Sequence, residues 1–285
     1  MVGYHAGPAI RLCYSCLPDS RPVEGRAGGS RGGEGVATLV VEIAPVSRSS
    51  KRRSLRLHGS IAQEIGTAIV TGRYQPNDLL PNEVTFSEKL QVSRTAYREA
   101  VRILAAKGLV TSRPKAGTRI SPRRSWHVLD PDVLRWIFEN GAPDPAFLQE
   151  LFELRQIVEP AAAALAAERR TAEDLDELRA ALDGMERHGL AVEDGREADR
   201  LFHEVILRAT GNGALGTLAP GIASAVRWTT LFKARDGRMP RDPLPEHVSV
   251  FQAIEQGDAA KARRAMGELV GLALHDIGAI ENSQT

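Results

Sequence analysis

"LPNEVTFSEKLQVSRTAYREAVRILAAKGLVTSRPKAGTRI" (residues 80–120) is the stretch that decides the fold of the N-terminal half of this chain. We expect a short helix over about residues 83–90, a tight turn through Val92 and Ser93, and a longer helix over about residues 94–107. Two helices joined by so short a turn are typical of a helix-turn-helix.

The longer helix has two faces of different chemistry. Tyr97, Val101 and Leu104 fall on one apolar stripe, and Arg94 and Arg98 belong to a basic stripe beside it. The apolar stripe is expected to pack against the rest of the domain. The basic stripe is then free to face DNA.

Flanking segments complete a small domain around these two helices. Residues 57–71 carry apolar side chains at helical spacing, and Gly72 is expected to end that helix. Residues 109–113 are expected to form a strand, residues 114–117 a turn and residues 118–120 the returning strand. The sequence therefore predicts a winged helix-turn-helix with a small basic wing.

Charge is divided unevenly along the 285 residues. Residues 51–124 contain 15 Lys and Arg against 5 Asp and Glu, whereas residues 125–285 contain 17 against 27. A basic stretch alone is often a solvated surface. A basic segment joined to an acidic one is the pattern expected of a module that binds a polyanion, fused to a module that does not.

Composition favours a cytoplasmic protein with more than one domain. The chain is longer than one small core usually needs. No stretch approaches the roughly 18 to 20 apolar residues of a membrane span, and the N-terminus lacks a basic start followed by an apolar run and a cleavage site. We therefore expect a protein of the cytoplasm that does not enter the membrane.

The chain divides into four expected parts. Residues 1–50 are expected to be a disordered extension, although its two cysteines form a lone C-x-x-C motif. Two thiols leave a zinc ion half coordinated, and no βαβ pattern surrounds them. Residues 51–124 are expected to form the DNA-binding domain, residues 125–145 a linker and residues 146–285 a helical domain.

The second half has the pattern of a helical bundle. Thr171 precedes an acidic residue by three positions, which favours a helix start, and Gly257 followed by Asp258 separates two helices. The expected helical segments are residues 151–170, 171–188, 196–209, 213–233, 246–256 and 258–280. An antiparallel bundle of about six helices can enclose a polar pocket in its core.

These segments resemble a known family of bacterial regulators. Residues 57–120 resemble the winged-helix domain of the GntR family, with its Val-Ser-Arg-Thr helix start, Gly-Leu-Val exit and Gly-Thr wing. Residues 151–170, 198–212 and 246–266 look like helices of the FCD ligand-binding domain of the FadR-type branch. Residues 125–141 are similar to the linker of galactonate-type sugar-acid repressors. The resemblance implies a mainly α protein that joins a winged helix-turn-helix to an antiparallel all-helical bundle.

The resemblance also implies which side chains contact DNA. Arg94 and Arg98 lie four residues apart on one face of the recognition helix, where arginine can bond guanine O6 and N7 together. The alternative is that they only solubilise the surface. Thr95 is expected to contact a phosphate or a thymine methyl group. Lys115 and Gly117 match the tip of a wing that enters the minor groove.

Three residues of the second half match metal ligands of the family. Asp199 and His203 are four residues apart and share a helix face, and His247 lies on another expected helix; the alternative is three ordinary core or surface residues. Metal-binding relatives have a histidine where this chain has Leu269, and His275 is rotated about 120° from that position. We therefore expect a divalent ion, zinc or a similar metal, held by three protein ligands, with open positions for water or effector oxygens.

Effector binding is expected to involve Arg155, which matches an arginine that faces the effector in relatives. A buried arginine is costly unless it is paired, so an anionic ligand would explain it, although Glu153 or Glu159 could be a structural partner instead. Asn212 and Arg227 are further candidates, with a helix cap and a solvent-facing side chain as their alternatives. The implied effector is a small carboxylate such as a sugar acid.

Together these features predict a transcription regulator that binds operator DNA as a homodimer and releases it when a sugar acid binds. A metal-dependent enzyme is the main alternative, because an open position on a metal could activate water. Against it, the sequence has no H-E-x-x-H motif and no phosphate-binding loop. A structural DNA-binding protein without a sensing role would leave the polar residues of the acidic domain unexplained.

Overall fold

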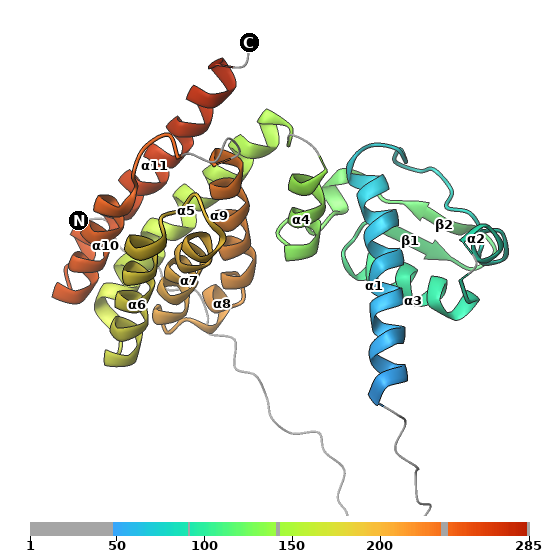
Figure 1. The fold of residues 1–285 in the computed structure, drawn as a ribbon, viewed down its shortest axis with the longest axis horizontal. Helices are drawn as coiled ribbons and strands as arrows, with labels where there is room; N and C mark the ends of the chain where they lie inside the picture. The colour runs from blue at the N-terminus through green and yellow to red at the C-terminus, as the bar shows by residue number, and fades with distance from the viewer. Residues whose placement is uncertain (1–47, 91, 141–142, 235–238, 284–285) are drawn as a thin grey trace, which may run out of the picture. The chain divides into compact units, whose positions relative to one another are not determined.

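The computed structural model describes residues 48–283, except residue 91 and residues 141–142 and 235–238. The C-x-x-C motif and nearly all of the expected extension therefore lie outside the described residues. The described part is mainly helical with one two-stranded sheet, which confirms the expected fold class (Figure 1). None of its helices combines the length and the apolar character needed to cross a membrane.

The helix-turn-helix forms where the sequence predicts it, whereas the first helix of this unit starts at Arg48, nine residues before the expected residue 57. Its helices are α1 (Arg48–Val70), α2 (Glu83–Leu90) and α3 (Arg94–Ala106). Ser93 caps α3, because its side chain accepts a hydrogen bond from the backbone N–H of Ala96 at 3.1 Å. Tyr97, Val101 and Leu104, the predicted apolar stripe, are buried in the core of this unit. The opposite face of α3 is left to the solvent.

A tight hairpin forms the wing. Its strands are β1 (Val110–Arg113) and β2 (Gly117–Ile120), which pair antiparallel, and a short 3-10 helix, η1 (Arg123–Ser125), follows. Lys115 and Gly117 have φ values of 65° and 77°. Glycine adopts this left-handed region without the Cβ clash that other residues meet, so Gly117 lets the chain turn back directly after the tip.

The segment expected to be a linker contains a helix, α4 (Pro131–Glu139). Asp130 caps it by accepting hydrogen bonds from the backbone N–H groups of Asp132 and Val133. Pro131 occupies the first turn, where its missing N–H leaves no helical bond unmade. The Asp-Pro pair is thus the start of a helix within the expected linker, for which the sequence analysis named no secondary structure.

Seven helices form the described part of the second half (Figure 1). They are α5 (Pro145–Arg169), α6 (Ala172–His188), α7 (Glu193–Ala209), α8 (Gly213–Gly216), α9 (Ala219–Lys233), α10 (Leu244–Gln256) and α11 (Ala259–Ser283). In the bundle α5 packs on α7 and α11, α7 packs on α6 and α9, and α10 packs on α11. Thr171 and Asp174 form a capping box at the start of α6, and Gly257 ends α10 at φ 75°. These contacts place α7 at the centre of a mostly apolar core.

Residues 213–233 form two helices instead of the single helical segment that the sequence favoured. α8 ends at Gly216, and α9 starts at Ala219 with Pro220 in its first turn. Proline has no N–H to donate and its ring clashes with the preceding turn, so it is favoured in the first turn of a new helix. The break leaves α9 free to take its own direction across α7.

Candidate functional site

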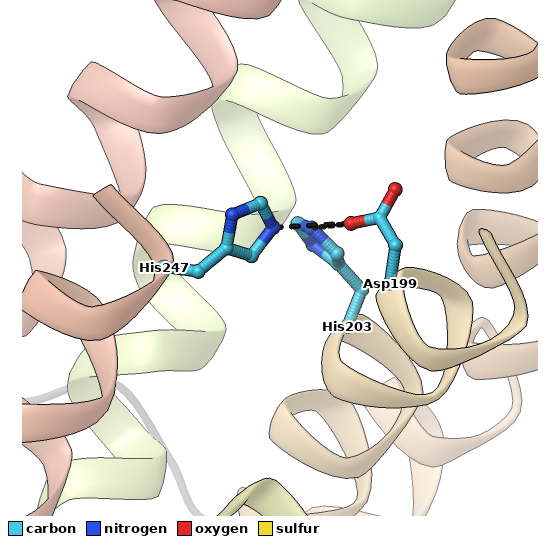
Figure 2. Close-up of side chains that lie close together, drawn as sticks. All are labelled: Asp199, His203 and His247. Atoms are coloured by element: carbon cyan, nitrogen blue, oxygen red, sulfur yellow. Dashed lines mark hydrogen bonds and ion pairs between the residues drawn. The ribbon is translucent and has the colours of Figure 1, made fainter. Parts of the chain in front are cut away.

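Three candidate metal ligands converge in the core of the bundle (Figure 2). Asp199 and His203 come from successive turns of α7, and His247 comes from the start of α10. All three side chains are buried, and one ligand atom from each lies within 4.8 Å of the others. The structure thus brings together the three residues that the sequence singled out from two separate helices.

Each histidine is oriented by a partner on its Nδ1 atom. His203 Nδ1 contacts Glu159 Oε2, and His247 Nδ1 faces the backbone oxygen of Pro243 at 2.7 Å. A ring nitrogen that faces an acceptor carries the proton, so Nε2 of the neutral imidazole keeps a free lone pair. Partners of this kind fix the orientation of histidines that ligate metals. Both Nε2 atoms lie beside Asp199.

The carboxylate of Asp199 is oriented as well. Thr230 Oγ1 donates to Asp199 Oδ2 at 2.9 Å, while Asp199 Oδ1 lies 3.0 Å from His247 Nε2 and 3.6 Å from His203 Nε2. Ligand atoms about 2.0–2.1 Å from a tetrahedral zinc ion are roughly 3.3 Å from one another. The two distances lie on either side of that value, and the three ligand atoms lie within 4.8 Å of one another, so the residues can hold a divalent ion once the ligand atoms draw closer together.

Buried charge surrounds the cluster. Burial alone would raise the pKa of Glu159, but the charges of Arg155 and His203 lower it to about 2. Burial would likewise raise the pKa of Asp199, but hydrogen bonds to His203 and His247 hold it well below its usual value. Burial alone would lower the pKa of His203, whereas Glu159 and Asp199 raise it to about 9. Without a metal, the cluster therefore binds a proton tightly at neutral pH.

The position expected for a fourth ligand is apolar. Leu269, on α11, is buried and lines the same cavity as Asp199, His203 and His247. His275 is exposed and does not belong to the cluster. Within the part of the chain that the structure describes, this cluster offers three candidate ligands, and the three-ligand metal site stays a prediction.

Arg155 lines this cavity and is already paired. Its Nε donates to Glu159 Oε1 at 2.6 Å, and its Nη1 donates to Thr229 Oγ1 at 3.2 Å. Of the two carboxylates that the sequence offered as its partner, Glu159 forms the bond, and Glu153 is exposed. Glu159 thus joins the predicted effector residue to the predicted metal ligand His203. The role of Arg155 toward an effector stays a prediction.

Sequence reasoning missed two further cations of the cavity. Lys233, at the end of α9, and Arg241, before α10, both line it. Burial lowers the pKa of Lys233 to about 8, although Asp199 and Asp276 act in the opposite direction. One sequence signal for these cations was available. Asp276 follows Leu269 by seven residues and so lies on the same face of α11, where a buried carboxylate calls for a cation as its partner. The cavity has a volume of only about 10 Å³, room for about one water molecule.

Asn212 and Arg227 are not among the side chains that line this cavity. Asn212 caps α8 by accepting hydrogen bonds from the N–H groups of Ala214 and Leu215. Arg227 is half-buried and bonds to Glu193 Oε1 at 2.5 Å. Asn212 thus has the capping role that was its alternative, whereas Arg227 is ion-paired and does not simply face water. An effector role for either residue stays a prediction.

The predicted DNA-contacting residues of α3 lie at its exposed N-terminal end. Arg94, Thr95 and Arg98 are all exposed. Among the residues that the structure describes, neither Arg94 nor Arg98 forms an ion pair, whereas Arg102 pairs with Glu99 at 2.5 Å. The two guanidinium groups are therefore available to a ligand outside the chain.

The wing and α3 border a shared groove. Arg98, Arg102, Lys115 and Gly117 are among the residues that line it, and its volume is about 640 Å³. Lys115 and Gly117 are exposed at the tip of the hairpin. The groove thus has basic side chains on both walls, as a surface for a polyanion requires.

Two protein-family models match the chain. Residues 57–120 match "Bacterial regulatory proteins, gntR family", a range that runs from within α1 to the end of β2. Residues 150–271 match the FCD domain, and this range contains the Asp199, His203 and His247 cluster. The two matches cover the two halves in which the candidate sites lie.

Curated proteins and solved structures resemble the chain over most of its length. The galactonate operon transcriptional repressor of Escherichia coli (strain K12) is 37% identical over 201 residues, which cover 69% of this chain and 87% of the relative. The Uxu operon transcriptional regulator of the same strain is 30% identical over 228 residues, covering 77% and 85%. The structure of Lar, which controls the expression of the Listeria monocytogenes agr system, has a TM-score of 0.55 at 19% identity and covers 77% of this chain and 95% of that chain. At that identity the likeness shows the fold alone.

Proposed function

Because this chain belongs to the GntR family of bacterial regulators and carries an FCD domain, we propose that it represses an operon for sugar-acid catabolism and leaves its operator when the acid binds. α3 and the wing bind the operator, and the helical bundle binds the effector. One observation carries the proposal: Arg94 and Arg98, exposed on α3 and without an ion pair to any described residue, occur in the same chain as a buried Asp-His-His cluster. Relatives whose matches cover more than two thirds of this chain are named for the galactonate and Uxu operons.

The operator is bound by a homodimer in the cytoplasm, where the DNA is. A two-fold dimer places two copies of α3 in successive major grooves of a palindrome. Replacing both Arg94 and Arg98 by Ala should weaken specific binding by about 1–3 kcal/mol per base contact and relax base preference, whereas Lys115→Ala should weaken binding more evenly across sequences. Operator titrations at several salt concentrations test this, with Arg263→Ala, an exposed arginine of α11, as control. Unchanged preference in the double variant would overturn the proposed DNA face.

The bundle holds a divalent ion, zinc or a similar metal, through Asp199 Oδ1, His203 Nε2 and His247 Nε2. When bound, such an ion offers open positions that carboxylate and hydroxyl oxygens can fill. Leu269 leaves one of these positions to the effector, and Arg155 offers its remaining N–H groups to an effector oxygen. Metal content after dialysis, with and without D-galactonate, should be higher with the acid in the wild type and low in Asp199→Ala. An Asp199→Ala variant that kept its metal and its effector response would contradict this site.

A regulator is favoured over the metal-dependent enzyme that the same cluster suggested. Both family models that match the chain support the regulator, because one is a model of bacterial regulatory proteins and the other is the FCD domain. Incubation of the zinc-loaded protein with a panel of sugar acids that includes D-galactonate tests this. Release of labelled operator with the acid recovered unchanged supports the regulator, and turnover of any acid contradicts it.

A further inference from the structure

Two cations beside the metal-ligand cluster are incompletely paired. Lys233 Nζ lies 3.9 Å from Asp276 Oδ2, which is beyond hydrogen-bond length. Arg241 Nε lies 3.1 Å from the same oxygen, and Arg241 Nη1 lies 2.9 Å from Glu246 Oε1. Within the described chain, however, none of the three buried guanidinium nitrogens of Arg241 makes a hydrogen bond of acceptable geometry. The two cations are neighbours, because they share Asp276 Oδ2.

Such groups call for a partner. Nearly all buried donors in folded proteins are hydrogen-bonded, and a buried charge without good partners is costly. The other cation of the cavity, Arg155, already has strong partners in Glu159 and Thr229. Lys233 and Arg241 are therefore the most weakly paired of these three cations, and a carboxylate is the group that can accept from an ammonium and a guanidinium at once.

The charge around the cavity also leaves room for one anion. The charged side chains are Arg155, Lys233 and Arg241 against Glu159, Asp199, Glu246 and Asp276. Three positive and four negative groups sum to one negative charge. A divalent ion on the neutral histidines changes this sum to one positive charge, which a single carboxylate neutralises.

We propose that Lys233 and Arg241 form the subsite for the effector's carboxylate, while its hydroxyl oxygens face Asp199, His203 and His247. This rests on the proposed function of the bundle and narrows the ligand class. The effector is a hydroxy acid with an ionised carboxylate at one end, and a polyol of the same length is not an effector.

Binding at this subsite requires partner exchange. A cavity of about 10 Å³ does not accommodate a carboxylate and its hydroxylated chain. The ligand carboxylate therefore takes the place of Asp276 and Glu246 beside Lys233 and Arg241, and the cavity widens as it enters. The contacts given up are the 3.9 Å ion pair and the poorly aligned pairs of Arg241, whereas the Arg155 to Glu159 bond is kept.

The experiment uses the full zinc-loaded chain, D-galactonate as probe and galactitol as its uncharged analogue. Calorimetry should give binding of galactonate but not galactitol. Lys233→Met and Arg241→Gln should each raise the Kd for galactonate at least tenfold. Lys233→Arg, which keeps the positive charge, should have a Kd within about threefold of the wild-type value. Arg227→Gln, on the same helix as Lys233 but outside the cavity, is the matched control and should leave the Kd unchanged.

Three further readouts separate a lost subsite from a misfolded bundle. The Lys233→Met and Arg241→Gln variants should keep their zinc content, their operator affinity without acid and a single cooperative thermal transition. Wild-type affinity for galactonate in both variants, or equal binding of galactitol, overturns the inference while the proposed function stands. If the wild type binds neither galactonate nor any other acid of the panel, the proposed function and the inference both fall.

Discussion

Glu159 joins Arg155 to His203 in the core of the bundle, so Glu159→Gln tests the reasoning about the site most directly. Glutamine has nearly the same shape and keeps one oxygen that can accept a hydrogen bond. It removes the charge that balances Arg155 and lowers the strength of the acceptor that faces His203 Nδ1. Two effects are expected, one on metal affinity and one on folding stability.

Their magnitudes follow from the burial of Glu159, whose side chain is 1% exposed. Loss of the partner behind a metal-ligating histidine typically weakens metal affinity about 10–100-fold. Removing one member of a buried ion pair leaves an uncompensated charge and costs roughly 3–5 kcal/mol. For a protein of this size each kcal/mol lowers Tm by about 2–4 °C, so the metal-free variant should melt about 6–20 °C below the wild type.

Zinc affinity is measured by competition with a chelator, and stability by thermal unfolding in EDTA. Glu153→Gln is the control, because Glu153 is exposed on the same helix and its loss should change stability by less than about 0.5 kcal/mol. The double variant Arg155→Met, Glu159→Gln should recover much of the stability, because it also removes the unpaired charge of Arg155. It should not recover the zinc affinity, because His203 still lacks the carboxylate on its Nδ1 atom. A Glu159→Gln protein with wild-type zinc affinity and Tm would refute the role given to this carboxylate.

Three other predictions concern the metal site and the recognition helix. Because Glu159 and Asp199 raise the pKa of His203 to about 9, the metal-free imidazole is protonated at pH 7; zinc binding should release about one proton from His203 and tighten as pH rises toward 9, measured by calorimetry in buffers of different ionisation enthalpy. Leu269→His should supply a fourth ligand, lower the zinc Kd at least tenfold and make metal retention independent of D-galactonate; unchanged retention after dialysis would count against the position of Leu269. Ser93→Ala should cost about 1 kcal/mol of stability in urea unfolding, because the N–H of Ala96 loses its acceptor, and Ser93→Asp should not.

The helix-turn-helix could be predicted closely because its signals are local. The Ser93 cap, the apolar stripe of α3 and the turn glycines each act within a few residues, and the structure places them as expected. The same kind of signal was present at Asp130 and Pro131, where a helix was missed because the segment was interpreted only as a connection. Pro220 was likewise a visible helix start inside a segment that was expected to be continuous.

The site was predicted in part, and the missing part is mostly long-range. The spacing of Asp199 and His203 shows that they share a helix face. The ion pair of Lys233 with Asp276 joins α9 to α11, and residue spacing within one helix cannot predict a contact between two helices. The partner of Arg155 is a different case. Glu159 follows it by four residues and shares its helix face, whereas Glu153 precedes it by two and points elsewhere, so helical geometry alone could have chosen between them.

In the proposed site, Leu269 would connect the metal to the regulation. A fourth protein ligand would close the coordination of a tetrahedral ion, and the ion would then be structural. With leucine there, one position would stay open to an effector oxygen, so the metal and the acid would stabilise each other's binding. By linkage, the factor by which D-galactonate raises zinc affinity must equal the factor by which zinc raises the affinity for D-galactonate. Leu269→His should reduce both of these factors toward one, because both depend on the same open coordination position.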